Sequence, residues 1–451
     1  MELLNLTKKP MNFENLKKTD KTAYDLIMAE MNRQETSLDI IPSECLASVS
    51  VIEALWSPLT NKYSEWYAKK RYYGGNEVID QVETLAIERA KVAFPGVAHV
   101  NVQPYSGSPA NMAIYNALCD AWDTILGLAL SQGWHLTHWH KVSATSKFFN
   151  AVQYGLNSDW FIDLDEVERL AIEHKPKVIV VGFTAYSREF PFEEFSKIAK
   201  KVGAYLMADI SHISGLVISG IHTSPAPFCD VIMTTTHKTL KWPRGAMIMV
   251  TEKGLEKDKD LWKKIDKSVF PGLQGWPHNH QTLAIAVALW EAVLPKFTEL
   301  NRQIVDNAKA LAKELSNYWF DVATGWTDNH LVLAWVGKWR GGFMQDALDK
   351  AWITLNKNTV PNDEWTAFYP SGIRMWTPIM SHRWMREEQA IKLASWMNEI
   401  KDLISEFKYQ ETKEKRIAQK KEFREFIKDN ETLKRIRQEV KEMCEMFPIY
   451  K

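Results

Sequence analysis

The stretch of sequence that decides the fold runs from Ala204 to Thr239, beginning AYLMADISH and ending CDVIMTTTHKT. In each of these two segments a short apolar run is followed by polar residues. Apolar runs of this length, alternating with helical patterns, are typical of buried parallel strands in an α/β fold. In such sheets ligands bind at the carboxyl ends of the strands. We therefore expect Asp209, His212 and Lys238, which follow the two runs, to belong to a ligand site.

The residue types at these strand ends point to one kind of chemistry. Lys238 ends a strand among hydroxyl side chains, so it is placed to lose its proton and form a Schiff base. Asp209 ends another strand and is placed to hold a pyridinium nitrogen protonated. Those are the two groups by which a protein captures and tunes pyridoxal phosphate. Taken singly, they are more often a surface lysine and a helix-capping aspartate, and the surrounding residues favour the cofactor.

The rest of the chain predicts how that sheet is built. From about residue 50 to residue 290, short apolar runs alternate with amphipathic stretches, which predicts a mainly parallel sheet covered on both faces. The expected strands are 177–183, 204–208, 231–235 and 246–250, and a helix over 192–202 is ended by Gly203. A long helical stretch over about 278–318 leads to a smaller sheet with strands at 331–334 and 371–375. From about 386 the chain is helical to near its end.

The length of 451 residues fits two domains plus extensions. We expect an N-terminal helical arm over 1–50 and a large cofactor-binding domain over 51–295. The remainder, 296–451, is expected to form a small C-terminal α+β domain with a helical tail.

Composition excludes several classes of function. Lys and Arg together number 56, as do Asp and Glu, so no net charge favours a nucleic acid or an anionic membrane as partner. No apolar run approaches the roughly 20 residues that span a bilayer, and the amino terminus lacks the apolar core of a signal peptide. The four cysteines have no metal-site spacing, which indicates neither a zinc site nor a disulfide framework. We expect no metal and a location in the reducing cytoplasm.

Further motifs surround the lysine in the sequence. Residues 61–75, NKYSEWYAKKRYYGG, place five aromatic residues and Glu65 before a Gly pair, and residues 270–280 read FPGLQGWPHNH. The turn Ser106-Gly107-Ser108 leads into a helix, where backbone N–H groups and hydroxyls can hold a phosphate. Alone that turn is a weak signal, because Ser and Gly at a helix start are more often an ordinary cap.

Read together and in this order, these segments resemble serine hydroxymethyltransferase, from about residue 20 to residue 400. The strings TTTHKT (234–239) and TDNHL (327–331) make a chance agreement implausible. The resemblance implies a pyridoxal-phosphate-dependent transferase of fold type I, with a large, mainly parallel domain and a smaller α+β domain. It implies reversible interconversion of serine and glycine, with transfer of the hydroxymethyl carbon to tetrahydrofolate. It also implies a homodimer with shared active sites.

The resemblance implies roles for the residues that would hold the cofactor. Lys238 would carry it as an internal aldimine, Asp209 would pair with the pyridine nitrogen, and His237 would shape substrate preference. His135 would stack on the ring. His212 and Thr184 would contact the phenolic oxygen side of the cofactor, and Ser106, Gly107 and Ser108 would hold its phosphate. Gly275 would reach in from a partner subunit, and Thr235 is a further expected cofactor contact.

Other residues would hold the substrates. Arg374 would bind the substrate carboxylate as a planar bidentate donor. Ser43 and Tyr73 would help to hold the substrate, and Tyr63 would come from across the dimer interface. Glu65 would be the acid/base near the serine hydroxymethyl group, where partial burial among tyrosines that include Tyr67 would raise its pKa. The positions that match the family's pterin contacts are Leu130, Leu136, Thr366, Ala367 and Phe368.

Two alternatives stay open from the sequence alone. One is a folate-independent aldolase of the same fold that cleaves 3-hydroxy amino acids, against which Glu65 and the pterin-side segments argue. The other is an inactive relative kept as a scaffold, against which Lys238, Asp209 and Glu65 argue. Each histidine, Arg374 and the tyrosine cluster could also be structural if taken one at a time.

The tryptophan content is the main departure from the family pattern. Trp, at 19, is as frequent as Phe, whereas Gly, at 20 of 451, falls below the usual share of about 7%. The family's glycine is expected at 14 tryptophans: Trp56, Trp66, Trp122, Trp134, Trp139, Trp160, Trp242, Trp276, Trp319, Trp326, Trp339, Trp352, Trp376 and Trp384. For Trp290, Trp335, Trp365 and Trp396 the family pattern is undecided. A reassigned codon, UGA read as glycine, would explain one replacement repeated so often. A further departure is Ala68-Lys69, which stands where the family has Pro-Gly.

Overall fold

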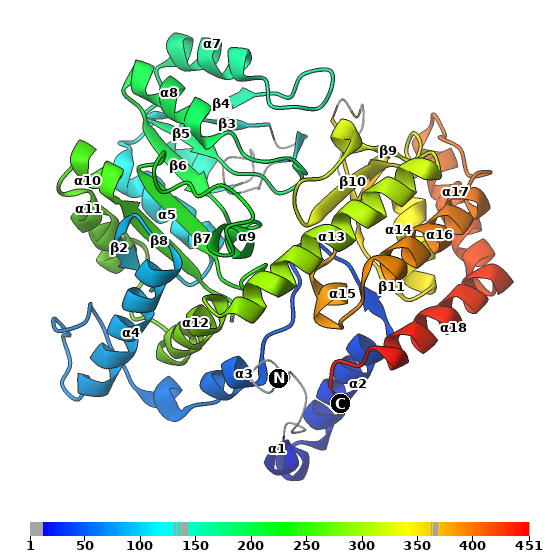
Figure 1. Ribbon diagram of the computed structural model, residues 1–451, viewed down its shortest axis with the longest axis horizontal. Coiled ribbons are helices and arrows are strands. Elements are labelled where there is room, and N and C mark those ends of the chain that lie inside the picture. Colours follow the sequence, from blue (N-terminus) through cyan, green and yellow to red (C-terminus); the bar gives the residue numbers. More distant parts are fainter. Residues whose placement is uncertain are drawn as a thin grey trace. The chain divides into compact units, whose positions relative to one another are not determined.

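The computed structural model describes residues 12–129, 132–133, 137, 143–241, 243–361, 363 and 369–450 (Figure 1). They form two compact units. One unit is Cys45–Arg302, and the other combines the described residues of 1–44 with those of 303–451. None of the described helices is both long and apolar enough to cross a membrane.

The first unit is built on a seven-stranded sheet (Figure 1). Its strands, in spatial order, are β2 (Val97–Asn101), β8 (Ala246–Thr251), β7 (Val231–Thr235), β6 (Tyr205–Asp209), β5 (Val178–Val181), β3 (Thr124–Leu128) and β4 (Asn150–Tyr154). The run from β7 to β4 is parallel, and β8 is antiparallel to both of its neighbours. The prediction of a mainly parallel sheet in an α/β fold is confirmed.

Helices precede, separate and follow the strands of this unit along the chain. They are α3 (Val49–Leu55), α4 (Glu77–Ala93), α5 (Gly107–Leu118), α6 (Thr145–Phe148), α7 (Leu164–His174), α8 (Phe192–Val202), α9 (Ser214–Ile218), α10 (Glu252–Lys257), α11 (Leu261–Lys267) and α12 (Asn279–Ala292). The predicted helix over 192–202 and its end at Gly203 are confirmed, since Gly203 has a φ of 73°. A left-handed residue of this kind is how glycine commonly ends a helix.

The predicted single helical stretch over 278–318 is two helices, α12 and α13 (Pro295–Asn317). The break falls at Val293 and Leu294, immediately before Pro295. Proline lacks the N–H that a helix interior needs and is favoured in the first turn of a helix, so it begins α13 instead of continuing α12.

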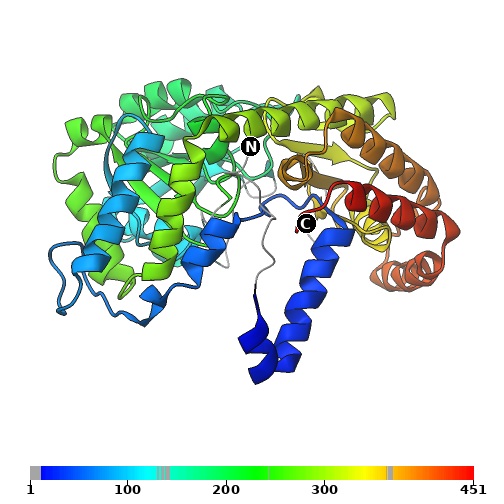
Figure 2. The ribbon, with the colours of Figure 1, turned by 60° about the horizontal axis from the view of Figure 1, so that its bottom comes forward.

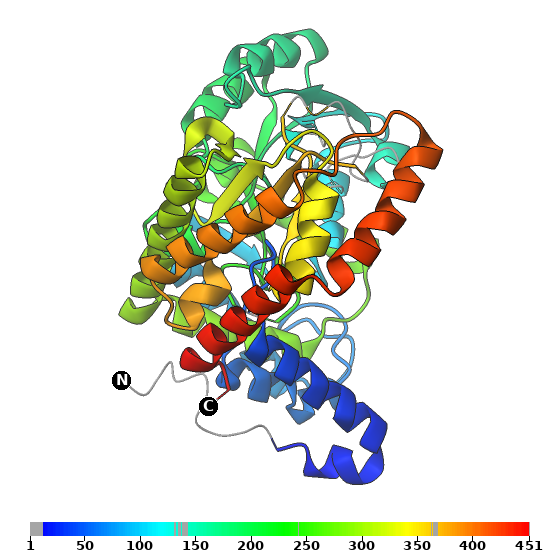
Figure 3. The same cartoon turned by 90° about the vertical axis from the view of Figure 1, so that its right-hand side faces the viewer.

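The second unit contains a four-stranded antiparallel sheet and a two-stranded parallel one. The larger sheet is ordered β12 (Asn356–Asn358), β13 (Gly372–Trp376), β10 (Leu331–Trp335) and β9 (Asp321–Val322); the smaller pairs β1 (Leu38–Asp39) with β11 (Ile353–Thr354). Its helices are α1 (Glu14–Thr19), α2 (Lys21–Thr36), α14 (Gly341–Lys350), α15 (Pro378–His382), α16 (Glu387–Leu403), α17 (Lys413–Lys428) and α18 (Glu431–Met446). The red helix α18 lies beside the blue α2 (Figure 2 and Figure 3). The helical carboxyl-terminal region is as predicted.

Gly182, directly after β5, tests how tightly the sheet edge is packed. A Cβ at this position would lie 2.1 Å from the backbone oxygen of Asp209, and its φ of 154° is one that L residues rarely adopt. We expect Gly182→Ala to lower the free energy of unfolding by at least about 1–3 kcal/mol, measured by urea denaturation. Gly74→Ala is the matched control, because nothing lies within 4 Å of its Cβ position. Equal unfolding midpoints for the two variants would contradict this packing.

Candidate active site

The ends of β6 and β7 bring the two central sequence motifs together. The strands pair in parallel with Asp209 opposite Met233. Beyond them, the backbone N–H of Ser211 donates to Oδ1 of Asp209 at 3.0 Å, and the N–H of Thr235 donates to Oγ of Ser211 at 3.0 Å. Asp209 and the turn that follows β7 are therefore held at one edge of the sheet.

Lys238 is buried in the turn after β7. The hydroxyl of Thr239 donates to the carbonyl oxygen of His212 at 3.0 Å and accepts from the N–H of Gly215 at 3.0 Å. A Cβ on Gly215 would lie 2.6 Å from the backbone oxygen of Thr239, so the two segments touch through their backbones. These contacts fix the backbone on the carboxyl side of the lysine.

His237 is neutral at physiological pH. Burial lowers its pKa to about 3, and the positive charges of Lys238 and Arg244 act in the same direction. A desolvated imidazole disfavours its charged form because that form loses hydration. The group beside Lys238 is therefore a neutral ring and not a second cation.

The first turn of α5 has the features of a phosphate site. Ser106 is the N-cap residue, yet its side chain makes no capping hydrogen bond. A Cβ on Gly107 would lie 2.7 Å from Cγ2 of Thr235, so only glycine lets the helix start approach β7 this closely. Oγ1 of Thr235 is buried and has no hydrogen-bond partner among the described residues. Unpaired N–H groups at a helix start and such a hydroxyl fit the phosphate of pyridoxal phosphate.

Thr184 and Gly275 are two further predicted cofactor contacts. Thr184 follows β5, and both its hydroxyl and its N–H donate to the backbone oxygen of Gly133 at 2.9 Å. Gly275 has open space around its Cβ position, and the hydroxyl of Tyr105 donates to the carbonyl of the next residue, Trp276.

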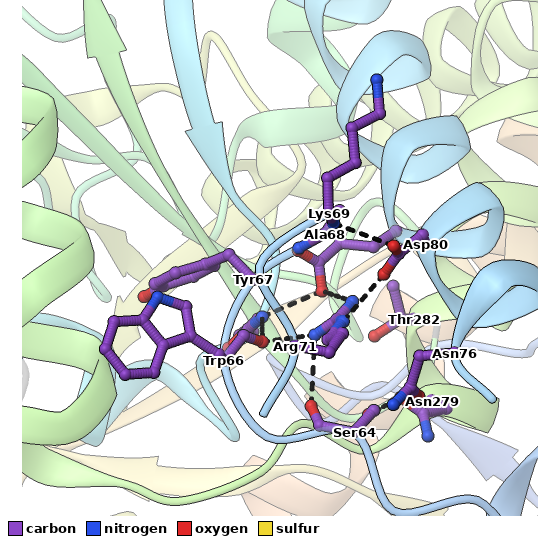
Figure 4. A network of polar contacts seen from close by, with 12 residues as sticks. Ser64, Trp66, Tyr67, Ala68, Lys69, Arg71, Asn76, Asp80, Asn279 and Thr282 are labelled. Atoms are coloured by element: carbon purple, nitrogen blue, oxygen red, sulfur yellow. Dashed lines mark hydrogen bonds and ion pairs between the residues drawn. The ribbon is translucent and has the colours of Figure 1, made fainter. Parts of the chain in front are cut away.

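The loop that carries Glu65 is held by a buried arginine (Figure 4). The guanidinium of Arg71 binds Asp80 at 2.9 Å and Glu83 at 2.8 Å, and donates to the backbone oxygens of Ser64 and Trp66. The side chains of Arg71 and Glu83 are only 3% and 4% exposed, so the pair is shielded from solvent. The carbonyls on both sides of Glu65 are thereby fixed by one side chain.

Glu83 and Gln103 complete this network. The carboxylate of Glu83 accepts from the backbone N–H of Ala68 at 3.0 Å and from Nε2 of Gln103 at 2.9 Å. Gln103 also donates to the carbonyl of Trp66 at 3.1 Å. The sequence analysis gave no role to these residues. One signal was present: Glu83 lies on the buried face of α4 with Ile79, Val82 and Ala86, where a charge requires a partner.

The tyrosines of the Glu65 segment differ in their surroundings. Tyr63 and Tyr73 are 40% and 44% exposed and meet edge to face with ring centroids 5.1 Å apart. Trp276 lies against Tyr63 at 4.5 Å between centroids. Tyr67 is a structural residue, because its hydroxyl donates to the backbone oxygen of Asp266 at 2.6 Å and accepts from Asn101 at 3.0 Å.

Two predicted substrate residues belong to the second unit. Arg374 lies on β13, where its Nε donates to Oδ1 of Asn356 at 3.2 Å. Burial lowers the pKa of Arg374 to about 10, which still leaves it charged at neutral pH. Ser43 has a φ of 105°. The predicted residues His135, Leu130, Leu136, Thr366, Ala367 and Phe368 lie outside the described part of the chain.

The mostly parallel sheet, with an aspartate at the end of one strand and a lysine after its neighbour, is the arrangement expected of a pyridoxal-phosphate-dependent enzyme of fold type I. The family model of serine hydroxymethyltransferase matches residues 16–397. Serine hydroxymethyltransferase of Acidothermus cellulolyticus is 52% identical over 390 residues, which are 86% of this chain and 90% of that protein. Serine hydroxymethyltransferase 2 of Pseudomonas putida is 44% identical over 435 residues, 96% of this chain and 97% of that protein. The chain belongs to the serine hydroxymethyltransferase family.

Membership of this family brings a defined reaction. Its enzymes interconvert serine and glycine, with pyridoxal phosphate as cofactor and tetrahydrofolate as the one-carbon acceptor. The predictions of fold, enzyme class, reaction and cofactors are confirmed at this level. Membership also favours hydroxymethyl transfer over the folate-independent aldolase.

Arg71 offers a test of the loop that carries Glu65. We expect Arg71→Met to lower the free energy of unfolding by about 3–5 kcal/mol, because it leaves Glu83 buried without its ion-pair partner. Turnover should fall further than stability alone explains, since the carbonyls around Glu65 are released. Urea denaturation and steady-state kinetics measure the two effects.

Arg169→Met is the matched control for Arg71→Met, because Arg169 forms an exposed ion pair with Glu173 on α7. Such pairs contribute about 0–1 kcal/mol. Similar losses in the two variants would show that the Arg71 network does not stabilise the loop.

Proposed function

We propose that Lys238 is the residue that holds pyridoxal phosphate in this chain, and that Asp209 controls the cofactor's electronic character. The observation that carries this proposal is the hydrogen-bonded pairing of the turns after β6 and β7, with the open first turn of α5 packed against Thr235. When bound, the cofactor supplies an electron sink for charge at the substrate's α carbon. The carboxylate of Asp209 would keep a proton on the pyridine nitrogen, which that role requires.

The phosphate would be held by the first turn of α5. Ser106, Gly107 and Ser108 offer backbone N–H groups and hydroxyls, and Thr235 adds a buried hydroxyl. Thr184 and His212 would contact the phenolic oxygen side, and His135 would stack on the ring. The neutral ring of His237 beside Lys238 supports a role in shaping the substrate pocket, since it adds no positive charge there.

Glu65 would move the proton of the reaction at the substrate's hydroxyl oxygen. In the direction from serine to glycine its carboxylate accepts the hydroxyl proton while the hydroxymethyl carbon leaves, and in reverse it returns that proton. The Arg71 network supports this role, because a general base must be held in a fixed place. Arg374 would bind the substrate carboxylate, and Ser43 and Tyr73 would help to hold the substrate.

Tetrahydrofolate would be held at Leu130, Leu136, Thr366, Ala367 and Phe368, the positions that match the family's pterin contacts. We also place the protein in a reducing compartment, the cytoplasm. The four cysteines are free thiols, and Cys229 and Cys444 are buried, which fits that setting.

The site is proposed to be shared between two copies of this chain. Tyr63 and Gly275 are the residues expected to reach the partner's cofactor. Tyr63, Tyr72, Tyr73, Leu273 and Trp276 leave large apolar surfaces exposed in the single chain. A concentration of exposed aromatic residues is typical of an interface with another protein surface.

The direct test of the lysine is chemical. Borohydride reduction of the holoenzyme followed by peptide mapping should place the cofactor on the peptide that contains Lys238. Lys238→Ala should abolish both the labelling and the conversion of serine to glycine with tetrahydrofolate. Lys91→Ala, at an exposed position on α4, should change neither. Cofactor fixed on another peptide would refute the assignment.

Sharing of the sites can be tested by mixing inactive variants. Co-expression of Tyr63→Ala with Lys238→Ala should restore activity in the heterodimer, up to about half of the native value, because one of its two sites then carries both lesions and the other carries neither. Co-expression of Asp209→Ala with Lys238→Ala is the control and should restore nothing, since both residues serve the same chain's site. Equal behaviour of the two mixtures would mean that each chain completes its own site.

A further inference from the structure

Left-handed backbone is concentrated at tryptophans in this protein. Twelve non-glycine residues of the described chain have a φ between 44° and 105°, and seven of them are tryptophan: Trp66, Trp122, Trp160, Trp319, Trp339, Trp352 and Trp384. A Cβ clashes with the carbonyl oxygen in this region, which glycine enters without strain. For a residue as bulky as tryptophan such a φ is a genuine outlier.

The seven tryptophans coincide with positions where the family pattern predicts glycine. Of the 14 positions, Trp134, Trp139 and Trp242 lie outside the described residues, so seven of the remaining eleven are left-handed. By contrast, none of the four other described tryptophans is left-handed. These lie within regular elements, namely α11, α12, β10 and α16: Trp262, Trp290, Trp335 and Trp396.

Two of the seven occupy a helix-ending motif that elsewhere in the chain contains glycine. After α13, the backbone N–H of Trp319 donates to the carbonyl of Ser316, and the N–H of Phe320 donates to the carbonyl of Leu315. After α15, the N–H groups of Trp384 and Met385 donate in the same way to the carbonyls of Ser381 and Met380. This is the Schellman motif, whose left-handed position favours glycine. After α8 and α9 the same pair of bonds surrounds Gly203 and Gly220, with φ of 73° and 66°.

The side chains of these two tryptophans offer nothing to offset the strain. Trp319 is 92% exposed and Trp384 is 61% exposed, so the indoles gain little from packing. The hydrogen bonds of the motif involve backbone groups alone and form equally well with glycine. At Trp319 and Trp384 the backbone therefore adopts the conformation of a glycine site, although the residue there is tryptophan.

Two further members of the seven are Trp339 and Trp66. Trp339 is buried, and its Nε1 has no hydrogen-bond partner among the described residues. Trp66 has a φ of 80°, and its carbonyl is held by Arg71 and Gln103 next to Glu65. The polar network, not the indole, determines the backbone there.

We propose that these seven positions are glycine in the native protein, because its source reads as glycine a codon, UGA, that the printed sequence renders as tryptophan. The proposal is restricted to the seven. At Trp56, Trp276, Trp326 and Trp376 the backbone is not left-handed and accepts any residue. It is also independent of the active-site assignments, since six of the seven lie outside the motifs named above.

The coding DNA of the source tests the codon. UGA is expected at all seven positions, with UGG at Trp262, which was never among the predicted glycines. Peptide mass spectrometry of the protein from its source should show glycine at Trp319 and Trp384. UGG at most of the seven, or indole-containing peptides at those two, overturns the proposal.

Stability measurements test the backbone argument separately. A chain carrying Gly at all seven positions should unfold at least about 10 °C above the chain as printed, or fold where that chain does not. Two variants of the seven-glycine chain should each have a thermal unfolding midpoint about 2–8 °C lower than that chain. One carries Gly203→Trp, and the other keeps tryptophan at position 319 with glycine at the other six positions. The control variant with Trp262→Gly, Trp290→Gly and Trp396→Gly should be less stable than its parent. No gain from the seven glycines, or a gain from the control set, would refute the inference.

Discussion

The parallel pairing of β6 with β7 is the constraint on which the rest of the site depends. It sets Asp209, the last residue of β6, opposite Met233, two residues before β7 ends at Thr235, so the turns that follow the two strands meet. Ser211 and Thr239 then tie those turns together through hydroxyl and backbone groups. Gly182 lies against the backbone of Asp209, and Gly215 lies against the backbone of Thr239, so neither position has room for a side chain. The apolar strands bury the core, while the chemistry is confined to the residues that follow them.

A second constraint acts on the loop that carries Glu65, and it is electrostatic. Burying an ion pair such as Arg71 with Glu83 adds little stability compared with an apolar pair, since desolvation offsets the attraction. Its value here is geometric. The planar guanidinium binds two carboxylates and two backbone carbonyls at once, which a lysine could not do. The loop is therefore fixed without a regular element of its own.

Local signals in the sequence predicted the strands at 231–235 and 246–250 and the helix 192–202, because apolar periodicity and Gly203 determine them. The break between α12 and α13 was not predicted, although Pro295 is a sequence signal for the start of a new helix. The order of the strands in the sheet and the pairing of Arg71 with Glu83 depend on contacts between distant segments, which periodicity does not encode. The strand-end position of Asp209 and Lys238 followed from the pattern alone. The roles of Arg374, Ser43 and the pterin-side residues came only from the family resemblance.

The tryptophans show that the fold is determined by the backbone pattern of the family more than by each residue of the printed chain. Left-handed conformation costs an L residue about 1–2 kcal/mol, so seven such sites together carry roughly 7–14 kcal/mol. Folded proteins have a total stability of only about 5–15 kcal/mol. Exposed indoles such as Trp319 recover little of this cost by packing. The hydrogen-bonded turns, the buried core and the active-site edge of this sequence all agree with one fold. The seven tryptophans conflict with that fold, and glycine removes the conflict at each of them.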